Sequence, residues 1–185
     1  MDVGGRTFDK LIRRPKTKLV TLHILSIKAK DLLKSIEVLK LKSYDEQTRK
    51  AISKWIEGAT IGYGHLIAKT DWNKYKNGLT KVKAGTLFEK DLAPFVRKVK
   101  NKVTANITQN EFDALIIFAF NIGKTGFSGS SVLKLVNNPG AKTVYSSLKK
   151  AWMAWNKSQG KDSQGLINRR KAEWQIYTKG IYKKW

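Results

Sequence analysis

The chain contains no cysteine, and its 185 residues include only two histidines and three prolines. The absence of cysteine excludes disulfide bonds and thiolate metal sites. His23 and His65 alone are too few for a histidine-rich metal centre. The sequence also lacks a glycine loop of the kind that holds the phosphates of a nucleotide or dinucleotide. We therefore expect a protein that works without a metal ion or another cofactor.

Acidic residues are also scarce, because 14 aspartates and glutamates stand against 37 lysines and arginines, for a net charge of +23. Such a surface attracts polyanions, whether nucleic acid, an anionic membrane or an acidic cell-wall polymer. The apolar run at residues 19–25 is too short to span a bilayer and lacks a cleavage-like end. We expect a soluble protein without a signal of its own, with a basic N-terminal extension at residues 1–24 and one domain at residues 25–185.

The apolar patterns predict an α+β fold that is mostly helical, with a small β-hairpin region after the first helix. Ser26 can cap that helix, whose apolar positions recur every three or four residues, and it should end near Glu37 to Leu39. Alternating patterns predict short strands over residues 39–44 and 60–66. Residues 45–58, which lie between them, form either a short helix or a long loop.

The rest of the chain reads as helical. Residues 80–103 predict one helix, with Pro94 as a kink or boundary. Thr108 to Glu111 is a capping box that opens a nearly all-apolar segment, the expected central helix, which Asn121 to Gly123 closes. The remaining expected elements are a loop over 126–130 and helices around 132–136, 143–155 and 166–177.

Glu37 stands out among the few acidic residues, because its nearest basic neighbours are Lys34 and Lys40 and its segment is otherwise apolar. Burial beside an apolar helix face raises the pKa of a carboxyl group, which is what a general acid at neutral pH needs. The other interpretation is a solvated glutamate at a helix end, the ordinary state of a charged residue. Spacing alone does not decide between the two.

The residues around Glu37 resemble a known family. Ile36-Glu37-x-Leu39-x-Leu41-x-x-Tyr44, followed by Thr-Ile-Gly-Tyr-Gly-His at residues 60–65, is similar to the phage-type lysozymes, the endolysins or muramidases of the T-even-like glycoside hydrolase family. The resemblance continues through Thr108-x-x-Glu-Phe-Asp-Ala-Leu115, Phe118-x-Phe-Asn-x-Gly123 and Gly165-Leu-x-Asn-Arg-Arg170-x-x-Glu173. It covers residues 26–177 and implies a lysozyme-like fold.

The resemblance also implies catalytic roles. Glu37 would protonate the glycosidic oxygen, and register makes Glu46 the second carboxylate. Asp45 is the alternative, because neighbours on an extended segment point to opposite faces. Thr60 would orient the attacking water, unless its hydroxyl caps its own backbone. The chain departs from the family pattern at Val38, where a glycine is usual, and in the thirteen residues between Glu46 and Thr60, a longer stretch than the family usually has.

Weaker roles follow for other residues. Three polar residues would border the saccharide cleft, although capping and turn chemistry explains them equally well: Asn121, Ser130 and Ser131. His65 would be structural, with its ring hydrogen-bonded near the first helix and Glu37. The glycines between Thr60 and His65 would let the strand turn sharply beneath the cleft and bring Thr60 near Glu37.

The implied substrate is peptidoglycan, cut at the β-1,4 bond between N-acetylmuramic acid and N-acetylglucosamine with inversion at the anomeric carbon. The protein would be a monomer, made in the host bacterial cytoplasm and acting on the wall from the periplasm. The basic, aromatic segment after Gly165 is either a core-packing terminal helix or a segment that binds anionic outer-membrane lipid or lipopolysaccharide.

Two alternatives come from other functional classes. A nucleic-acid-binding domain fits the charge, yet no zinc-finger spacing, RNP-like motif or recognition helix is present. A non-catalytic wall- or membrane-binding protein descended from lysozymes also fits the charge. Of the three readings, the enzyme explains Glu37 and the stretch from Thr60 to His65 together.

Overall fold

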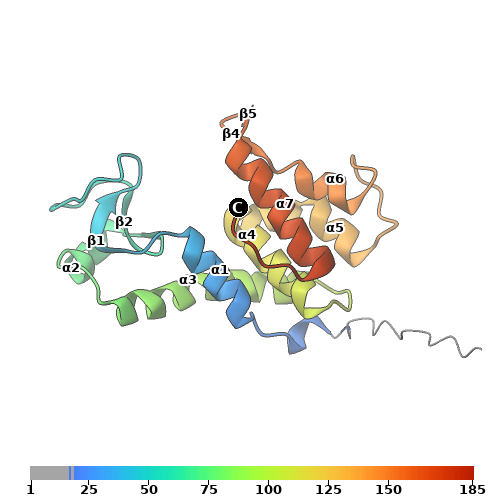
Figure 1. Cartoon of the computed structure of the whole chain (residues 1–185), viewed down its shortest axis with the longest axis horizontal. Helices are drawn as coiled ribbons and strands as arrows, with labels where there is room; N and C mark the ends of the chain where they lie inside the picture. Colours follow the sequence, from blue (N-terminus) through green and yellow to red (C-terminus); the bar gives the residue numbers. More distant parts are fainter. Residues whose placement is uncertain (1–16, 18) are drawn as a thin grey trace, which may run out of the picture.

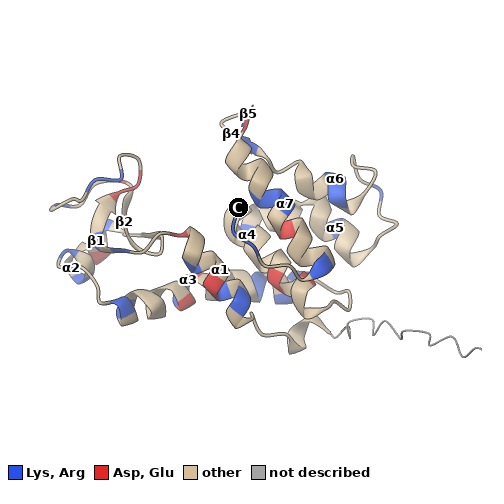
Figure 2. Ribbon diagram, in the orientation of Figure 1, with Lys and Arg blue, Asp and Glu red and all other residues tan. Residues whose placement is uncertain are grey.

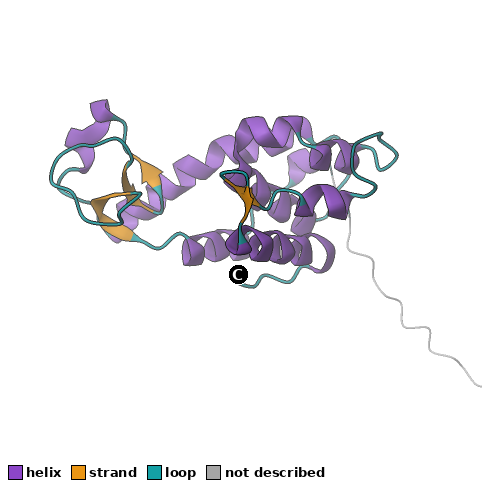
Figure 3. Cartoon of the chain, turned by 90° about the horizontal axis from the view of Figure 1, so that it is seen from above, coloured by secondary structure: helices purple, strands orange, loops and turns teal. Residues whose placement is uncertain are grey.

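The computed structural model describes residue 17 and residues 19–185. The small sheet lies at one end of the molecule and most helices lie at the other (Figures 1 and 3). In chain order the elements are η1 (Val20–Leu22), α1 (Ile27–Ile36), β1 (Lys40–Asp45), β2 (Ala59–Gly62), β3 (His65–Leu66), η2 (Lys69–Asp71), α2 (Trp72–Tyr75), α3 (Lys81–Lys102), α4 (Gln109–Gly129), α5 (Ser131–Asn137), α6 (Leu148–Met153), β4 (Lys157–Ser158), β5 (Lys161–Asp162) and α7 (Gln164–Lys179). This order confirms the predicted α+β class.

Helix α1 begins and ends where its sequence predicts. Ser26 is the N-cap, and its Oγ accepts a hydrogen bond from the N–H of Ala29. The buried face carries Ala29, Leu32 and Leu33. The last helical residue is Ile36, so Glu37 stands at the C-cap.

Strands β1, β2 and β3 form one antiparallel sheet in that order. Tyr44 pairs with Thr60 across β1 and β2, and Ile61 pairs with His65 across β2 and β3. The prediction of a single strand over residues 60–66 is wrong. Gly62 and Gly64 adopt positive φ values of 69° and 84°, so they fold this segment into a tight hairpin.

The stretch between β1 and β2 is a long loop, one of the two structures that the sequence allowed. An isolated bridge joins Tyr44 to Ala51. Farther along, Trp55 anchors the loop by donating from Nε1 to the carbonyl of Ile67 (2.9 Å). The N–H of Ile52 also donates to the carbonyl of Ser43 (3.0 Å), so the loop is fastened at several points along its length.

Helices α3 and α4 form the centre of the fold. Helix α3 continues through Pro94, and α4 opens with the predicted capping box, in which Thr108 and Glu111 exchange hydrogen bonds. Gly123 interrupts α4 at φ 82°, after which the chain is helical again to Gly129, so the loop expected over 126–130 is wrong. Gly126 serves packing there, because a Cβ would lie 3.3 Å from the ring of Trp155.

The helix predicted over 143–155 is much shorter, because α6 begins only after the N-cap Ser147. Thr143 bonds the local backbone instead: its hydroxyl donates to the carbonyl of Tyr145 and accepts from the N–H of the same residue. The two-stranded hairpin of β4 and β5 was not expected from the sequence.

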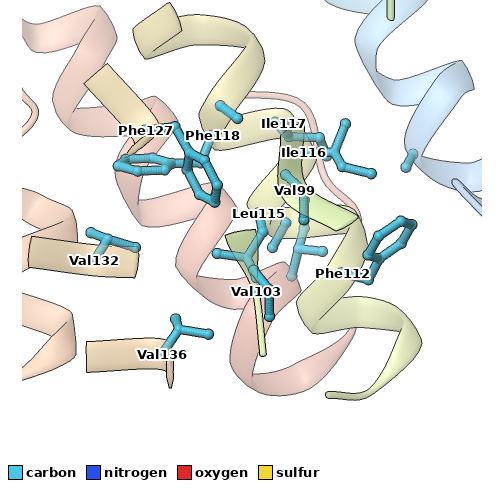
Figure 4. Packing of buried hydrophobic residues seen from close by; sticks show 14 of the residues in the cluster. Val99, Val103, Phe112, Leu115, Ile116, Ile117, Phe118, Phe127, Val132 and Val136 are labelled. Carbon is cyan, nitrogen blue, oxygen red and sulfur yellow. The ribbon is translucent and has the colours of Figure 1, made fainter. Parts of the chain in front are cut away.

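The main hydrophobic core lies between α1 and the helices α3 to α7. Its buried side chains include Phe112, Phe118 and Val132, which Figure 4 shows with their neighbours. We call this part the helical lobe. Residues 40–79 form the hairpin lobe, whose buried cluster is Ala59, Ile61 and Ile67. The predicted extension at residues 1–24 lies largely outside the described residues, and its described end packs on the helical lobe through Val20 and His23.

Candidate active site

Glu37 stands where the chain leaves α1 for the sheet. Its N–H still donates to the carbonyl of Leu33 (2.9 Å), while its dihedrals of φ −77° and ψ 86° turn the chain out of the helix. Val38, at the position where a glycine is usual, is exposed and does not adopt a positive φ. The turn after the helix is therefore made without a glycine.

Four effects set the acidity of Glu37. Burial raises the pKa of its carboxyl group above the ordinary value and is the largest of them. The guanidinium groups of Arg169 and Arg49 lower this pKa, because positive charge stabilises the ionised form, and the negative charge of Glu46 raises it. The net rise keeps the proton on Glu37 to a higher pH than on a solvated glutamate, as a general acid requires.

A cleft of about 380 Å³ opens beside Glu37. It is lined by residues from the end of α1, from β1, from the following loop and from the hairpin turn: Ile36, Glu37, Val38, Lys40, Tyr44, Arg49 and Gly64. A Cβ at Gly64 would lie 3.4 Å from Oε2 of Glu37. The glycine therefore lets the β2–β3 turn come close to the acid without covering it.

The two candidates for the second carboxylate differ in their surroundings. The Asp45 carboxylate accepts from the N–H of Gln47 (3.0 Å) and from the hydroxyl of Thr48 (2.7 Å), and these bonds lower the pKa of Asp45. Asp45 thus closes a turn at the surface. Glu46 acts on the pKa of Glu37, whereas Asp45 is not among the groups that do.

Thr60 is buried in β2, directly opposite Tyr44 of β1. Its hydroxyl donates to the carbonyl of Gly58 (2.9 Å), the residue just before β2. This is the backbone bond that the alternative interpretation of Thr60 describes. Thr60 does not line the cleft beside Glu37.

Arg49 is a cleft residue that the sequence did not reveal. It lies in the long loop at φ 60°, a conformation uncommon for a residue other than glycine. Its guanidinium lies 5.8 Å from the ring centroid of Tyr44, and Nη1 is 3.5 Å from the Tyr44 hydroxyl oxygen. The sequence did not predict this position, because the loop between β1 and β2 has no regular apolar period. Without such a period nothing in the sequence shows where the Arg49 side chain points.

Helix α7 carries a buried ion cluster. Arg169 and Arg170 each donate to Oε1 of Glu173 at 3.0 Å, and Trp152 donates to Oε2 at the same distance. Burial lowers the pKa of Arg170 to about 10. The cluster reaches Glu37 through the charge of Arg169, so a motif on the last helix takes part in the electrostatics of the first.

The three residues expected at the saccharide cleft do not line the pocket at Glu37. Asn121 is exposed and accepts a hydrogen bond from Nη2 of Arg170. Ser130 is buried and caps α5, where its hydroxyl accepts from the N–H of Leu133 and donates to the carbonyl of Phe127. Ser131 is the first residue of α5. Asn121 alone of the three is joined to the ion cluster.

His65 contacts a different helix from the one predicted. Its Nδ1 lies 3.0 Å from both carboxylate oxygens of Asp91 on α3, and its ring packs against Tyr75. The expected bond near α1 is therefore wrong, because the hairpin turns the ring toward α3. Within the described residues, no three His, Asp or Glu side chains converge as a metal site would require.

Comparison with known proteins decides the family. The model of the phage lysozyme family matches residues 34–173. The chain belongs to the phage lysozyme family. It is 35% identical over 153 residues to an endolysin of Bacillus phage PZA, covering 83% of this chain and 54% of that protein. It is 34% identical over 138 residues to the endolysin of Salmonella phage P22, covering 74% of this chain and 90% of the relative.

A solved structure agrees with this placement. The muramidase domain of SpmX from Asticaccaulis excentricus is 30% identical and superimposes with a TM-score of 0.65, covering 84% of this chain and 98% of the other. The family predicted from the ordered motifs is thereby confirmed. This phage lysozyme family member spans about half the length of the Bacillus phage relative. No helix in the described part of the chain is long and apolar enough to cross a membrane.

Proposed function

We propose that this protein hydrolyses peptidoglycan at the β-1,4 bond between N-acetylmuramic acid and N-acetylglucosamine. The observation that carries the proposal is Glu37, a carboxyl group of raised pKa beside an open cleft and within the electrostatic reach of a second carboxylate. The relatives named as endolysins, and the similar domain named as a muramidase, support the same reaction.

Glu37 is the general acid of the proposed mechanism. Its protonated carboxyl donates to the glycosidic oxygen as the bond to the anomeric carbon breaks and the sugar gains oxocarbenium character. Burial keeps the proton in place before the reaction. Arg169 and Arg49 then stabilise the carboxylate that remains after proton transfer.

Glu46 is the second carboxylate of this mechanism. It is supported over Asp45 because the Asp45 oxygens are occupied by the turn at residues 45–48. As a base, Glu46 takes a proton from a water that attacks the opposite face of the sugar, which gives inversion. Comparing Glu46→Gln with Asp45→Asn tests the assignment, and the larger loss of turnover identifies the base.

Thr60 orients that water. Its hydroxyl hydrogen is donated to Gly58, so its oxygen lone pairs remain to accept a hydrogen bond from water. Thr60→Ser keeps this group and Thr60→Val removes it. The role is supported if Thr60→Val loses turnover while Thr60→Ser keeps it. It is contradicted if the two variants have the same turnover.

We also propose that three polar residues contact the saccharide, although the structure supports them to different degrees: Asn121, Ser130 and Ser131. Asn121 is the strongest of them because it is exposed and retains donors for a sugar hydroxyl. The Ser130 hydroxyl is occupied by its helix cap. We expect Asn121→Ala to raise KM more than kcat falls.

The proposed setting is the bacterial cell wall, reached from the periplasm by a monomer. Binding of outer-membrane lipid or lipopolysaccharide through the basic segment after Gly165 stays a prediction. Its aromatic residues pack inward: Trp174 and Tyr177 stack on each other at 5.5 Å and both contact Trp152. A peptide of residues 143–185 that fails to permeabilise vesicles containing lipopolysaccharide would remove this role.

The test of the function compares wild type with Glu37→Gln in two assays. Release of reducing ends from purified peptidoglycan reports the chemistry, and lysis of permeabilised Gram-negative cells reports its consequence. Glu57→Gln is the matched control, because Glu57 is an exposed glutamate in the long loop. Activity in wild type and control that is absent in Glu37→Gln supports the proposal. Wall binding without sugar release by wild type favours the non-catalytic alternative instead.

A further inference from the structure

Large aliphatic side chains are unusually exposed in the segment before and at the start of α1. The exposed fractions are 58% for Leu19, 65% for Leu22, 77% for Ile24 and 77% for Ile27. Single exposed aliphatic residues are common, but a group of them on a folded surface marks a site of interaction. Four such residues lie here within nine positions.

The same segment is firmly attached to the helical lobe. Val20 and Leu25 are buried, so they alternate with the exposed residues. His23 lies 2.9 Å from the carbonyl of Ile107 through Nε2, and its ring stacks on Phe112. The apolar side chains are therefore held outward by a packed backbone.

Cations border Ile24, one of these aliphatic residues. Ile24 lines a hollow of about 270 Å³ together with Leu92, Val96 and the cations Arg97 and Lys100. Lys100 Nζ also donates to the backbone carbonyl of Thr21 (3.1 Å), which fixes it beside the segment. The lining of the hollow thus combines apolar side chains with cations, and it also includes Lys30, which pairs with the lining carboxylate Glu89 (2.8 Å).

A second hollow adjoins the first along α3. It measures about 490 Å³ and shares Arg97 with the first. Its other cations are Lys98 of α3 and Lys124 of α4, and its described lining includes no carboxylate. Figure 2 shows lysine and arginine on helices at both ends of the molecule. Leu22, Ile24, Ile27, Arg97, Lys98 and Lys100 together form what we call the apolar–basic face.

We propose that the apolar–basic face docks the protein onto an anionic phospholipid bilayer. Aliphatic side chains that enter the boundary between headgroups and acyl chains, with lysine and arginine at headgroup level, are the physical basis of interfacial binding. The net charge of +23 adds long-range attraction to the same surface. This binding goes beyond peptidoglycan hydrolysis and does not depend on it.

The exposed aliphatic residues distinguish a bilayer from the other anionic partners that the positive charge could bind. A nucleic acid or an anionic wall polymer would be held by the cations alone, and exposed isoleucines would add nothing to its binding. A bilayer uses both parts of the face. Dependence on Ile24 and Ile27 therefore separates these partners.

The first experiment measures co-flotation of the full chain with vesicles of phosphatidylcholine, with and without an equal part of phosphatidylglycerol. Ile24→Asn combined with Ile27→Asn should weaken binding to the anionic vesicles by about tenfold or more. The matched control is Val82→Asn with Val144→Asn, two valines that are 80% and 90% exposed elsewhere. Equal binding by the two double variants overturns the proposal.

The cations are tested in the same assay. Arg97→Gln with Lys98→Gln should weaken binding on the order of tenfold, since each surface cation contributes to attraction by anionic lipid. Lys149→Gln with Lys150→Gln, exposed lysines on α6, is the matched control. Equal loss in both would show attraction by net charge without a defined face, and it would overturn the proposal.

The position of the face is read directly with a fluorophore. Because the chain contains no cysteine, Ile24→Cys and Val144→Cys each give one labelling site. An environment-sensitive dye at position 24 should shift to the blue with anionic vesicles, while the dye at position 144 should not. No shift at position 24, or binding of nucleic acid or wall polymer but not of vesicles, overturns the proposal.

Discussion

The helical lobe and the hairpin lobe are held together in different ways. The helical lobe has a continuous core in which Phe118, Trp152 and their neighbours are fully buried. The hairpin lobe has a small cluster built on Ile61, and its long loop contains the strained backbone of Arg49. Regions with few buried apolar contacts open more easily than a packed core.

The candidate site lies where the two lobes meet. Glu37 ends a helix of the strong lobe, while Glu46 and Arg49 belong to the hairpin lobe. The comparison teaches that stability and the proposed catalysis depend on different residues, so mutation can separate them. The following predictions test that separation.

Glu37→Gln has the largest expected effect. Activity should fall on the order of a thousandfold, because the proposed general acid is lost. Stability at neutral pH should not fall, because burial disfavours the ionised carboxylate that the substitution removes. Sugar release and thermal unfolding measure the two quantities. A large loss of stability would show that Glu37 is a structural residue of the lobe junction.

Phe118→Ala should give the converse result. Phe118 is fully buried, with its ring centroid 4.7 Å from that of Trp152, so its truncation should lower the free energy of unfolding by about 3–5 kcal/mol. Urea unfolding measures this loss. Turnover per folded molecule should stay close to that of wild type, and a loss of turnover beyond the unfolded fraction would break the division between the lobes.

A pair of identical, smaller substitutions compares the two cores directly. Ile116→Val and Ile61→Val each remove one methylene from a fully buried side chain and should cost about 0.5–1.5 kcal/mol locally. In the helical lobe the loss should appear in global unfolding. In the hairpin lobe it should appear as faster amide exchange in β1 to β3. Identical exchange patterns in the two variants would mean that the lobes unfold as one unit.

Arg49→Gln has the smallest expected effect and acts through the pKa of Glu37. In the proposed mechanism activity requires protonated Glu37, so activity should fall as pH rises through the raised pKa of Glu37. Arg49 lowers the pKa, and its removal should move the alkaline limb of the pH profile upward. Arg49→Lys keeps the charge and serves as control. An unchanged limb would mean that Arg49 does not act on Glu37.

The raised pKa of Glu37 also makes the free energy of unfolding depend on pH. The folded state binds this proton more tightly than the unfolded state, whose value is close to 4.5. The resulting stabilisation is complete below about 4.5 and is lost as pH rises through the folded-state pKa. Glu37→Gln should remove this pH dependence from the unfolding curve.

Local signals were enough for much of the fold. Ser26 and the Thr108–Glu111 capping box set helix starts, because a cap acts within one turn of its own residue. The position of Glu37 at a helix end followed from the same short-range pattern. The sequence failed where local bonds competed with a helical pattern, as at Thr143, and where two glycines split a strand into a hairpin.

The sequence by itself determined the family, the helix ends and the carboxyl group at the end of α1, since these depend on residues within a few positions of one another. Tertiary structure decided the rest of the site. It separated the surroundings of Asp45 and Glu46, paired His65 with Asp91, and brought Arg49 and Arg169 to act on Glu37 from opposite lobes. Charge, burial and distance between remote segments exist only once the chain has folded, and those quantities set the pKa of Glu37.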